Sequence, residues 1–329
     1  MRLWIALAAL TLSLPDIHHA QAQNSPTTER ATAASPAPSD WTSYGRDNAA
    51  TRYSPLRQIT RDNVDQLEPA WVYQTGDMPP PEVDDKWAPE NTPLKVGNSL
   101  YLCSAMNILI GLDAGSGRER WRFDPQVPID HIPYSAACRG VSYYEVPDPE
   151  PAQACARRVI EGTLDARLIA VDADTGQPCE DFGNSGQVNL LEGMGDSPPG
   201  YVAVTSAPTI VRNVVVVGHQ VLDGQKEDAP SGVIRGYDAE TGELAWAWDM
   251  GRPGETGMPA EGEQYTRGTP NAWTTFSADD ELGLGLGDGL GALALGHHQP
   301  DQHRHRQVHL GDFRRPQDGE RARQQIAQR

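Results

Sequence analysis

The 329-residue sequence is poor in basic side chains, and this deficit limits its partners. Its 27 lysines and arginines stand against 45 aspartates and glutamates, so the formal net charge is -18 at pH 7. A polyphosphate would be repelled by such a chain, because its recognition needs a positive surface. We therefore exclude nucleic acid as a partner and interpret the acidic surface as a solubilising one.

Long apolar runs are also missing. The apolar stretch at residues 3–14 is well short of the roughly 20 apolar residues that a membrane-spanning helix needs. Residues 20–22 (Ala-Gln-Ala) supply the small-x-small pattern of a cleavage site, and no lipobox-type cysteine follows. We therefore expect a secretory signal peptide over residues 1–22, with no transmembrane segment after cleavage and a periplasmic location.

Cysteine is scarce, and its spacing does not resemble a zinc site. In an exported chain, widely separated cysteines can form one or two disulfides. The pairing that we prefer is Cys138 with Cys155, although sequence alone does not fix it. The four cysteines are Cys103, Cys138, Cys155 and Cys179.

Long helical patterns are almost absent, and turn-forming residues are frequent. Residues 23–40 are rich in Ser, Thr, Ala and Pro, which predicts a flexible leader. The remainder of the chain contributes most of the 32 glycines and 27 prolines and is only moderately hydrophobic. This composition predicts an all-β fold of many short strands joined by turns.

One pattern recurs in three places: an apolar strand, an Asp-x-x-Ser/Thr-Gly turn and a second strand. The glycine allows the positive φ that such a hairpin turn needs, and the aspartate can accept backbone N–H bonds. A tryptophan in the second strand would pack between adjacent sheets. The turns span residues 113–117, 172–176 and 238–242, and the tryptophans are Trp121 and Trp246.

The spacing of these hairpins predicts a repeat architecture. They recur at intervals of roughly 60 residues, which favours the four-stranded propeller blade as the unit. Trp71 closes an earlier half-copy of the pattern. The middle copy has Glu180 where the tryptophan would stand, and Phe182 is a possible substitute.

Several motifs in fixed order resemble the glucose/quinate group of quinoprotein dehydrogenases. They lie at residues 41–48 (Trp-Thr-Ser-Tyr-Gly-Arg-Asp-Asn), 92–97 (Thr-Pro-Leu-Lys-Val-Gly), 138–141 (Cys-Arg-Gly-Val) and 231–236 (Ser-Gly-Val-Ile-Arg-Gly). The resemblance runs from about residue 41 to about residue 284. It implies a part of an eight-bladed propeller that holds pyrroloquinoline quinone (PQQ) and Ca²⁺ or Mg²⁺ on its axis. It also implies oxidation of sugars or polyols, with electrons passed to a respiratory quinone.

The resemblance also assigns cofactor-binding residues. Arg139 corresponds to the arginine that pairs with a cofactor carboxylate. The planar guanidinium group suits this role because it can present two parallel N–H donors to the carboxylate. Glu90 matches an acidic residue of the pocket, and Trp273 matches the tryptophan on which the quinone ring lies. Three hydroxyl side chains fall near pocket positions and could donate hydrogen bonds, namely Thr163, Thr205 and Ser206.

The sequence departs from the family pattern at the metal and substrate positions. Asp223 aligns with the first residue of an Asp-Asn pair implicated in cation binding, but Gly224 replaces the Asn. Ser135 stands where sugar-oxidising relatives tend to carry His, and Gln74 where they often carry Arg. Glucose is therefore not established as the substrate. The adjacent-cysteine disulfide of the alcohol-oxidising branch is absent, which disfavours that branch.

The chain changes character after residue 284. Residues 285–329 are rich in Gly, His, Gln and Arg, and such a composition predicts an aberrant, disordered tail. We favour an out-of-frame translation over a histidine metal site, the alternative that the clustered imidazoles suggest. The histidines in question are His297, His298, His303, His305 and His309.

The number of hairpins limits what the chain can do. With about 55 to 65 residues per blade, residues 41–284 can form three to four blades. The catalytic Asp of the family and a cofactor-contacting Lys belong to later blades and have no counterpart here. We therefore expect the chain alone to be inactive. Two other functions stay open: a non-catalytic propeller scaffold of the outer-membrane assembly type, and a sugar-binding module without redox chemistry.

Overall fold

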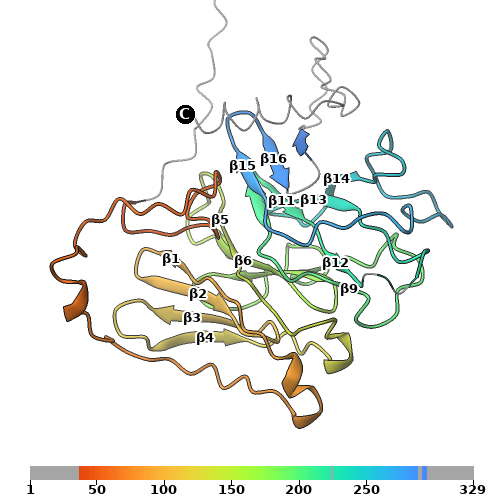
Figure 1. Ribbon diagram of the computed structural model, residues 1–329. Coiled ribbons are helices and arrows are strands. Elements are labelled where there is room, and N and C mark those ends of the chain that lie inside the picture. The colour runs from red at the N-terminus through yellow and green to blue at the C-terminus, as the bar shows by residue number, and fades with distance from the viewer. Residues whose placement is uncertain (1–36, 223, 225, 288–290, 295–329) are drawn as a thin grey trace, which may run out of the picture. The chain divides into compact units, whose positions relative to one another are not determined.

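The computed structural model describes residues 37–222, 224, 226–287 and 291–294 (Figure 1). This part of the chain is almost entirely β-structure, as the sequence predicted. Its helices are short 3₁₀ segments, at Val64–Gln66 (η1), Pro81–Lys86 (η2) and Ile129–His131 (η3). No helix among these residues is long and apolar enough to span a bilayer.

Three antiparallel sheets have four strands each and follow one another along the chain. The first contains β1 (Leu94–Val96), β2 (Ser99–Cys103), β3 (Leu109–Asp113) and β4 (Glu119–Phe123). The second contains β5 (Ser142–Glu145), β6 (Arg157–Gly162), β7 (Arg167–Asp172) and β8 (Gln187–Asn189). The third contains β10 (Thr209–Val211), β11 (Val214–Val217), β13 (Ile234–Asp238) and β14 (Leu244–Trp248).

Two smaller sheets accompany them. A short ribbon pairs β9 (Val202–Ala203) with β12 (Gln220–Val221). A three-stranded sheet contains β15 (Ser277–Asp279), β16 (Leu284–Gly287) and β17 (Gly291–Ala294). Part of the segment after residue 284 is thus paired as strands. The signal peptide, most of the leader and residues 295–329 lie outside the described residues, so those expectations stay predictions.

The three predicted hairpin turns are confirmed, and their geometry is the same each time. In the first, Oδ1 of Asp113 accepts hydrogen bonds from the backbone N–H of Gly115 at 3.2 Å and of Ser116 at 2.9 Å. Asp172 and Asp238 do the same in the second and third turns. The closing glycines have φ between 69° and 71°, in the left-handed region where an L side chain is strained. They are Gly117, Gly176 and Gly242.

Hydrophobic residues fill the space between successive sheets. One buried cluster joins Leu109 and Trp121 of the first sheet to Val159 and Val171 of the second. A larger cluster joins the second and third sheets, and it includes Phe182, which is fully buried. The sheets are therefore held face to face by apolar burial, the main favourable term in folding.

The disulfides correct the pairing that the sequence analysis preferred. Cys138 bonds to Cys103 and Cys155 bonds to Cys179, so the expected Cys138–Cys155 bridge is wrong. The first disulfide joins β2 to the loop before β5, and the second joins the loop before β6 to the segment after β7.

Removing the Cys155–Cys179 bridge should destabilise the protein. In the loop-entropy model, a bridge across a sequence separation of 24 residues lowers the conformational entropy of the unfolded chain and so stabilises the folded state by about 3 kcal/mol. We expect the double alanine variant to lose about that much free energy of unfolding in guanidinium titrations. Peptide mapping of the native protein should recover Cys155 linked to Cys179. Recovery of Cys138 linked to Cys155 instead would contradict the assignment.

Candidate functional site

Three loops from distant parts of the chain meet at Arg139. The backbone N–H of Thr92 donates to the Arg139 carbonyl at 2.9 Å, and the Arg139 N–H donates to the Thr205 carbonyl at 3.0 Å. The loop before β1, the loop before β5 and the segment after β9 are therefore fixed side by side. The three loops together position the guanidinium.

The Arg139 side chain contacts Glu90 and Trp273, two of the residues that the resemblance named. Its Nη2 atom lies 2.8 Å from Oε2 of Glu90, and its guanidinium carbon lies 5.1 Å from the ring centroid of Trp273. Trp273 is 44% exposed, so much of its indole remains open to a flat ligand. A pair as solvated as Arg139 and Glu90 contributes little to stability. Arg139, Glu90 and Trp273 therefore form one cluster.

The three predicted hydroxyl residues differ in what their side chains do. Thr205 is buried and its hydroxyl oxygen has no hydrogen-bond partner among the described residues. The Ser206 hydroxyl donates to the Trp273 carbonyl at 2.5 Å and so fixes that loop. The Thr163 hydroxyl donates to Asp165 at 2.5 Å, within the turn between β6 and β7. Of these three hydroxyls, only that of Thr205 lacks a partner among the described residues.

A buried carboxyl that the sequence analysis missed lies beside Cys138, the residue before Arg139. Glu161 on β6 is fully buried, and its Oε2 atom lies 3.8 Å from Sγ of Cys138. Its Oε1 atom has no partner among the described residues. Burial raises the pKa of Glu161 well above its ordinary value, and a hydrogen bond from Asn107 offsets only part of this effect. Glu161 follows Val159 and Ile160 on β6, and no local motif distinguishes it.

A second missed residue is His219, which precedes β12. Its Nε2 atom is 2.8 Å from the Ser231 carbonyl, which requires Nε2 to carry the proton and donate it. Burial and, secondarily, the nearby charge of Arg235 lower the pKa of His219 to about 4. The imidazole is therefore neutral at physiological pH and serves as a hydrogen-bond donor to the backbone.

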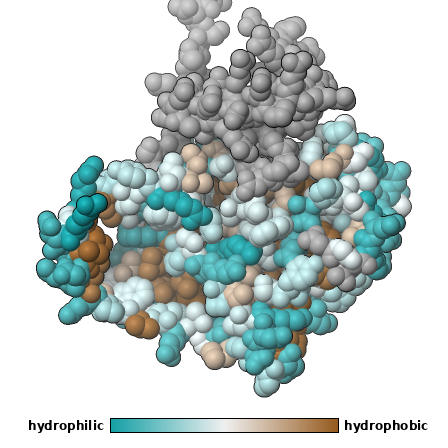
Figure 2. Space-filling view, in the orientation of Figure 1, coloured by the Kyte–Doolittle hydropathy of each residue, from teal (hydrophilic) through white to brown (hydrophobic). Residues whose placement is uncertain are grey.

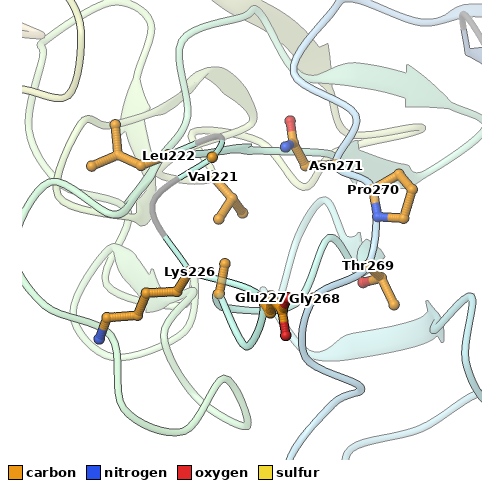
Figure 3. A pocket seen from close by; sticks show the side chains of 10 residues that line it. Val221, Leu222, Lys226, Glu227, Gly268, Thr269, Pro270 and Asn271 are labelled. Atoms are coloured by element: carbon orange, nitrogen blue, oxygen red, sulfur yellow. The ribbon is translucent and has the colours of Figure 1, made fainter.

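An open pocket of about 340 Å³ adjoins the cluster through the Gly268–Trp273 segment (Figure 3). Leu222 and Gly224 line its wall, and Lys226 and Glu227 bring one charge of each sign. Asp223, the predicted cation ligand, lies outside the described residues, so the metal site stays a prediction. The pocket is lined by Val221, Leu222, Gly224, Lys226, Glu227, Ala229, Gly268, Thr269, Pro270 and Asn271.

Comparison with known proteins identifies one family. Residues 41–286 match the family described as glucose/ethanol/alcohol dehydrogenase, beta-propeller domain, with PQQ as its short name. The chain is 51% identical to the glycerol dehydrogenase large subunit of Gluconobacter oxydans (strain 621H) over 83% of this chain and 37% of that protein. It is 42% identical to the quinoprotein glucose dehydrogenase of Escherichia coli (strain K12) over 74% of this chain and 31% of that protein.

Solved structures support the same fold. A quinohemoprotein alcohol dehydrogenase from Pseudomonas putida HK5 aligns with a TM-score of 0.56 and 30% identity over 75% of this chain. The enzyme of the same name from Comamonas testosteroni aligns with a TM-score of 0.56 and 28% identity. Each alignment covers 34% of the solved chain, so this chain spans about a third of the length of its relatives.

Proposed function

Because the chain belongs to the family of PQQ-dependent quinoprotein dehydrogenases with a β-propeller domain, we propose that it supplies part of the cofactor site of such an enzyme. The enzyme would oxidise CH–OH groups of sugars, polyols or quinate-like alcohols in the periplasm and pass the electrons to a respiratory quinone. Glycerol, glucose and quinate appear in the names of the relatives, which supports a polyol or cyclic polyhydroxy substrate.

The observation that carries the proposal is the contact of Arg139 with both Glu90 and Trp273. The three residues are separated by about 50 and about 130 positions in the sequence, and no local pattern requires them to meet. A guanidinium and an open indole face suit a flat polycarboxylate. The cluster therefore supports a PQQ site rather than a propeller scaffold without a ligand.

The residues present fit PQQ, judged by their chemistry. Arg139 would pair with a carboxylate of the cofactor, and the unpartnered hydroxyl of Thr205 would donate a hydrogen bond beside it. Trp273 would support the ring system, with Ser206 holding the tryptophan's backbone in place. When bound, PQQ accepts two electrons from the alcohol. Ca²⁺ or Mg²⁺ would be held near Asp223, and the base that takes the substrate proton belongs to later sheets of the family.

Titration with PQQ tests this proposal directly. We expect the purified chain to bind PQQ, measured by calorimetry and by quenching of tryptophan fluorescence. Arg139→Ala should weaken binding by roughly tenfold or more, because a charge-assisted hydrogen bond contributes about 1.5–3 kcal/mol. Arg139→Lys should recover only part of the loss, because lysine lacks the planar fork.

The matched control is Arg157→Ala. Arg157 also pairs with a carboxylate, that of Asp174 at 2.5 Å, but it is the first residue of β6 and its side chain is half exposed. Its replacement should leave PQQ binding unchanged. Equal losses in the two alanine variants, or no PQQ binding by the native chain, would refute the assignment. Dye reduction with glycerol, glucose and quinate should show no turnover by the chain alone.

A further inference from the structure

The ion pair of Arg139 with Glu90 is too exposed to hold its own geometry. The side chain of Arg139 is 22% exposed and that of Glu90 is 47% exposed. Salt and water screen a pair in such a position, and ordering two long side chains costs conformational entropy. A binding site nevertheless needs its charged groups held to within about 0.5 Å. Other contacts must therefore fix the two loops that carry the pair.

Backbone hydrogen bonds join these two loops at their ends. At one end the Ala88 N–H donates to the Ala136 carbonyl at 3.1 Å, and at the other the Thr92 N–H donates to the Arg139 carbonyl at 2.9 Å. Between these bonds the first loop has three residues, 89–91, and the second has two. Residues 89–91 form no backbone hydrogen bond within the described part of the chain. Side chains must therefore order the stretch that carries the glutamate.

One disulfide contacts both loops in this stretch. Cys138, which is bonded to Cys103, directly precedes Arg139 in the chain. Asn91, which directly follows Glu90, donates a hydrogen bond from Nδ2 to Sγ of Cys103 at 2.8 Å. The bridge holds the two cysteine Cα atoms 6.1 Å apart, near the upper end of the range that a disulfide allows. The backbone beside each member of the ion pair is thus tied to the same bridge.

The bridge lies inside the protein. Figure 2 shows a mainly hydrophilic surface over the described residues, with apolar atoms at several places. Cys103 is 2% exposed and Cys138 is 3% exposed, so the bridge contributes little to that surface. From the second sheet, Oε2 of Glu161 approaches Sγ of Cys138 to 3.8 Å. Burial protects the sulfur atoms from reagents in solution, so the bridge is suited to a permanent positioning role.

The other disulfide, Cys155–Cys179, supports a different feature. The backbone N–H of Cys155 donates to the carboxylate of Asp172, the aspartate of the second hairpin turn, at 2.9 Å. Arg158 donates from Nε to the Cys155 carbonyl at 2.9 Å. The two bridges close sequence separations of 35 and 24 residues, so they should stabilise the folded chain by similar amounts. The second bridge is therefore a matched control for the first.

We propose that the Cys103–Cys138 bridge and Asn91 position Arg139 and Glu90 for cofactor binding. The bridge fixes the backbone before Arg139, and Asn91 fixes the backbone after Glu90 to the same bridge. They are positioning residues, because they act through the ion pair. The proposal rests on the proposed function for the identity of the ligand, whereas the position of the pair can be measured without a ligand.

Titration with PQQ measures the effect of removing the bridge from the full chain. Replacing both Cys103 and Cys138 by alanine should raise the dissociation constant about fivefold, because neighbouring residues of one network are energetically coupled. In an Arg139→Ala background the same replacement should change it by less than about twofold, because the positioned group is absent. The chain with Cys155→Ala and Cys179→Ala should bind PQQ as the native chain does.

The indole ¹⁵N–¹H signal of Trp273 gives a second measurement that needs no PQQ. The guanidinium carbon of Arg139 lies 5.1 Å from the ring centroid, so the signal responds to the position of this group. Its absence from the spectrum of Trp273→Phe assigns it. Removal of the Cys103–Cys138 bridge should move the signal toward its position in Arg139→Ala. Asn91→Ala keeps the bridge and should move the signal in the same direction, through Glu90.

Three outcomes would overturn the proposal. The first is an equal loss of PQQ affinity on removal of either bridge, which would indicate a general effect of stability. The second is a native Trp273 signal in both the bridge-free chain and Asn91→Ala. The third applies if the bridge-free chain does not fold: Asn91→Ala then decides alone, and a native signal in it refutes the proposal. If the native chain does not bind PQQ, the proposed function fails, and the Trp273 signal still tests the positioning role.

Discussion

Replacing Trp121 by alanine is expected to lower the free energy of unfolding by about 3–5 kcal/mol, the range for a large buried aromatic. Trp121 is only 7% exposed and fills the space between Gly111 and Gly176. Both glycines leave room that no other side chain can fill, so the variant retains a cavity. The hydrogen bond to the Ala173 carbonyl is lost as well. Guanidinium titration followed by circular dichroism measures the change.

Two further variants separate the causes. Trp121→Phe keeps most of the ring contact and loses the N–H, so it should cost about 1–3 kcal/mol for the carbonyl left unpaired. Trp273→Ala removes an indole of the same size that is 44% exposed, and it should cost much less than Trp121→Ala. If Trp121→Ala and Trp273→Ala proved equally destabilising, the conclusion that Trp121 stabilises the contact between the two sheets would be wrong.

The repeat could be predicted from the sequence because its physics is local. The turn aspartate accepts bonds from residues two and three positions later, and the turn glycine follows within the same five residues. The tryptophan lies in the next strand at a fixed distance. The middle copy of the repeat departs from this local pattern. Its closing strand β8 begins only at Gln187, after a loop that contains Cys179 and the buried Phe182.

The disulfide pairing could not be predicted, because it depends on which loops the sheets bring together. Cys138 lies close to Cys155 in the sequence, yet it bonds to Cys103, 35 residues away. The hydrogen-bond partners of hydroxyl groups could not be predicted for the same reason. Thr163 and Thr205 have the same side chain, but the Thr163 hydroxyl has an acceptor in its own turn, whereas the Thr205 hydroxyl has no partner in the part of the chain that the structure describes. Only the arrangement of neighbouring loops distinguishes them.

The site cluster was reached through family resemblance and not through spacing. Arg139, Glu90 and Trp273 stand in separate loops, and each alone is an ordinary surface residue. The contacts at 2.8 Å and 5.1 Å are a property of the assembled sheets. Glu161 was overlooked for the opposite reason, since a single carboxyl near the end of a short strand has no sequence signal for a pocket.

Glu161 gives the second large prediction, a loss of stability as the pH rises. Burial raises its pKa in the folded protein above the ordinary value of 4.5 that the unfolded chain retains. Between these two pKa values the folded protein holds one proton more than the unfolded chain. The free energy of unfolding therefore falls by about 1.4 kcal/mol per pH unit from this group. Its contribution is complete below the unfolded pKa and is lost as the pH rises through the folded pKa.

The variant Glu161→Gln should remove this slope, because the amide has no proton to lose. At pH 5 the variant should differ from the native chain by about 1 kcal/mol, and by pH 8 it should be the more stable of the two. Guanidinium titrations at pH 5, 6, 7 and 8 measure the difference, in which the contributions of all other titrating groups cancel. Glu150→Gln, at an exposed position, should run parallel to the native chain at every pH. A native chain and a Glu161→Gln variant with the same pH dependence would show that the buried carboxyl is stabilised in its charged form.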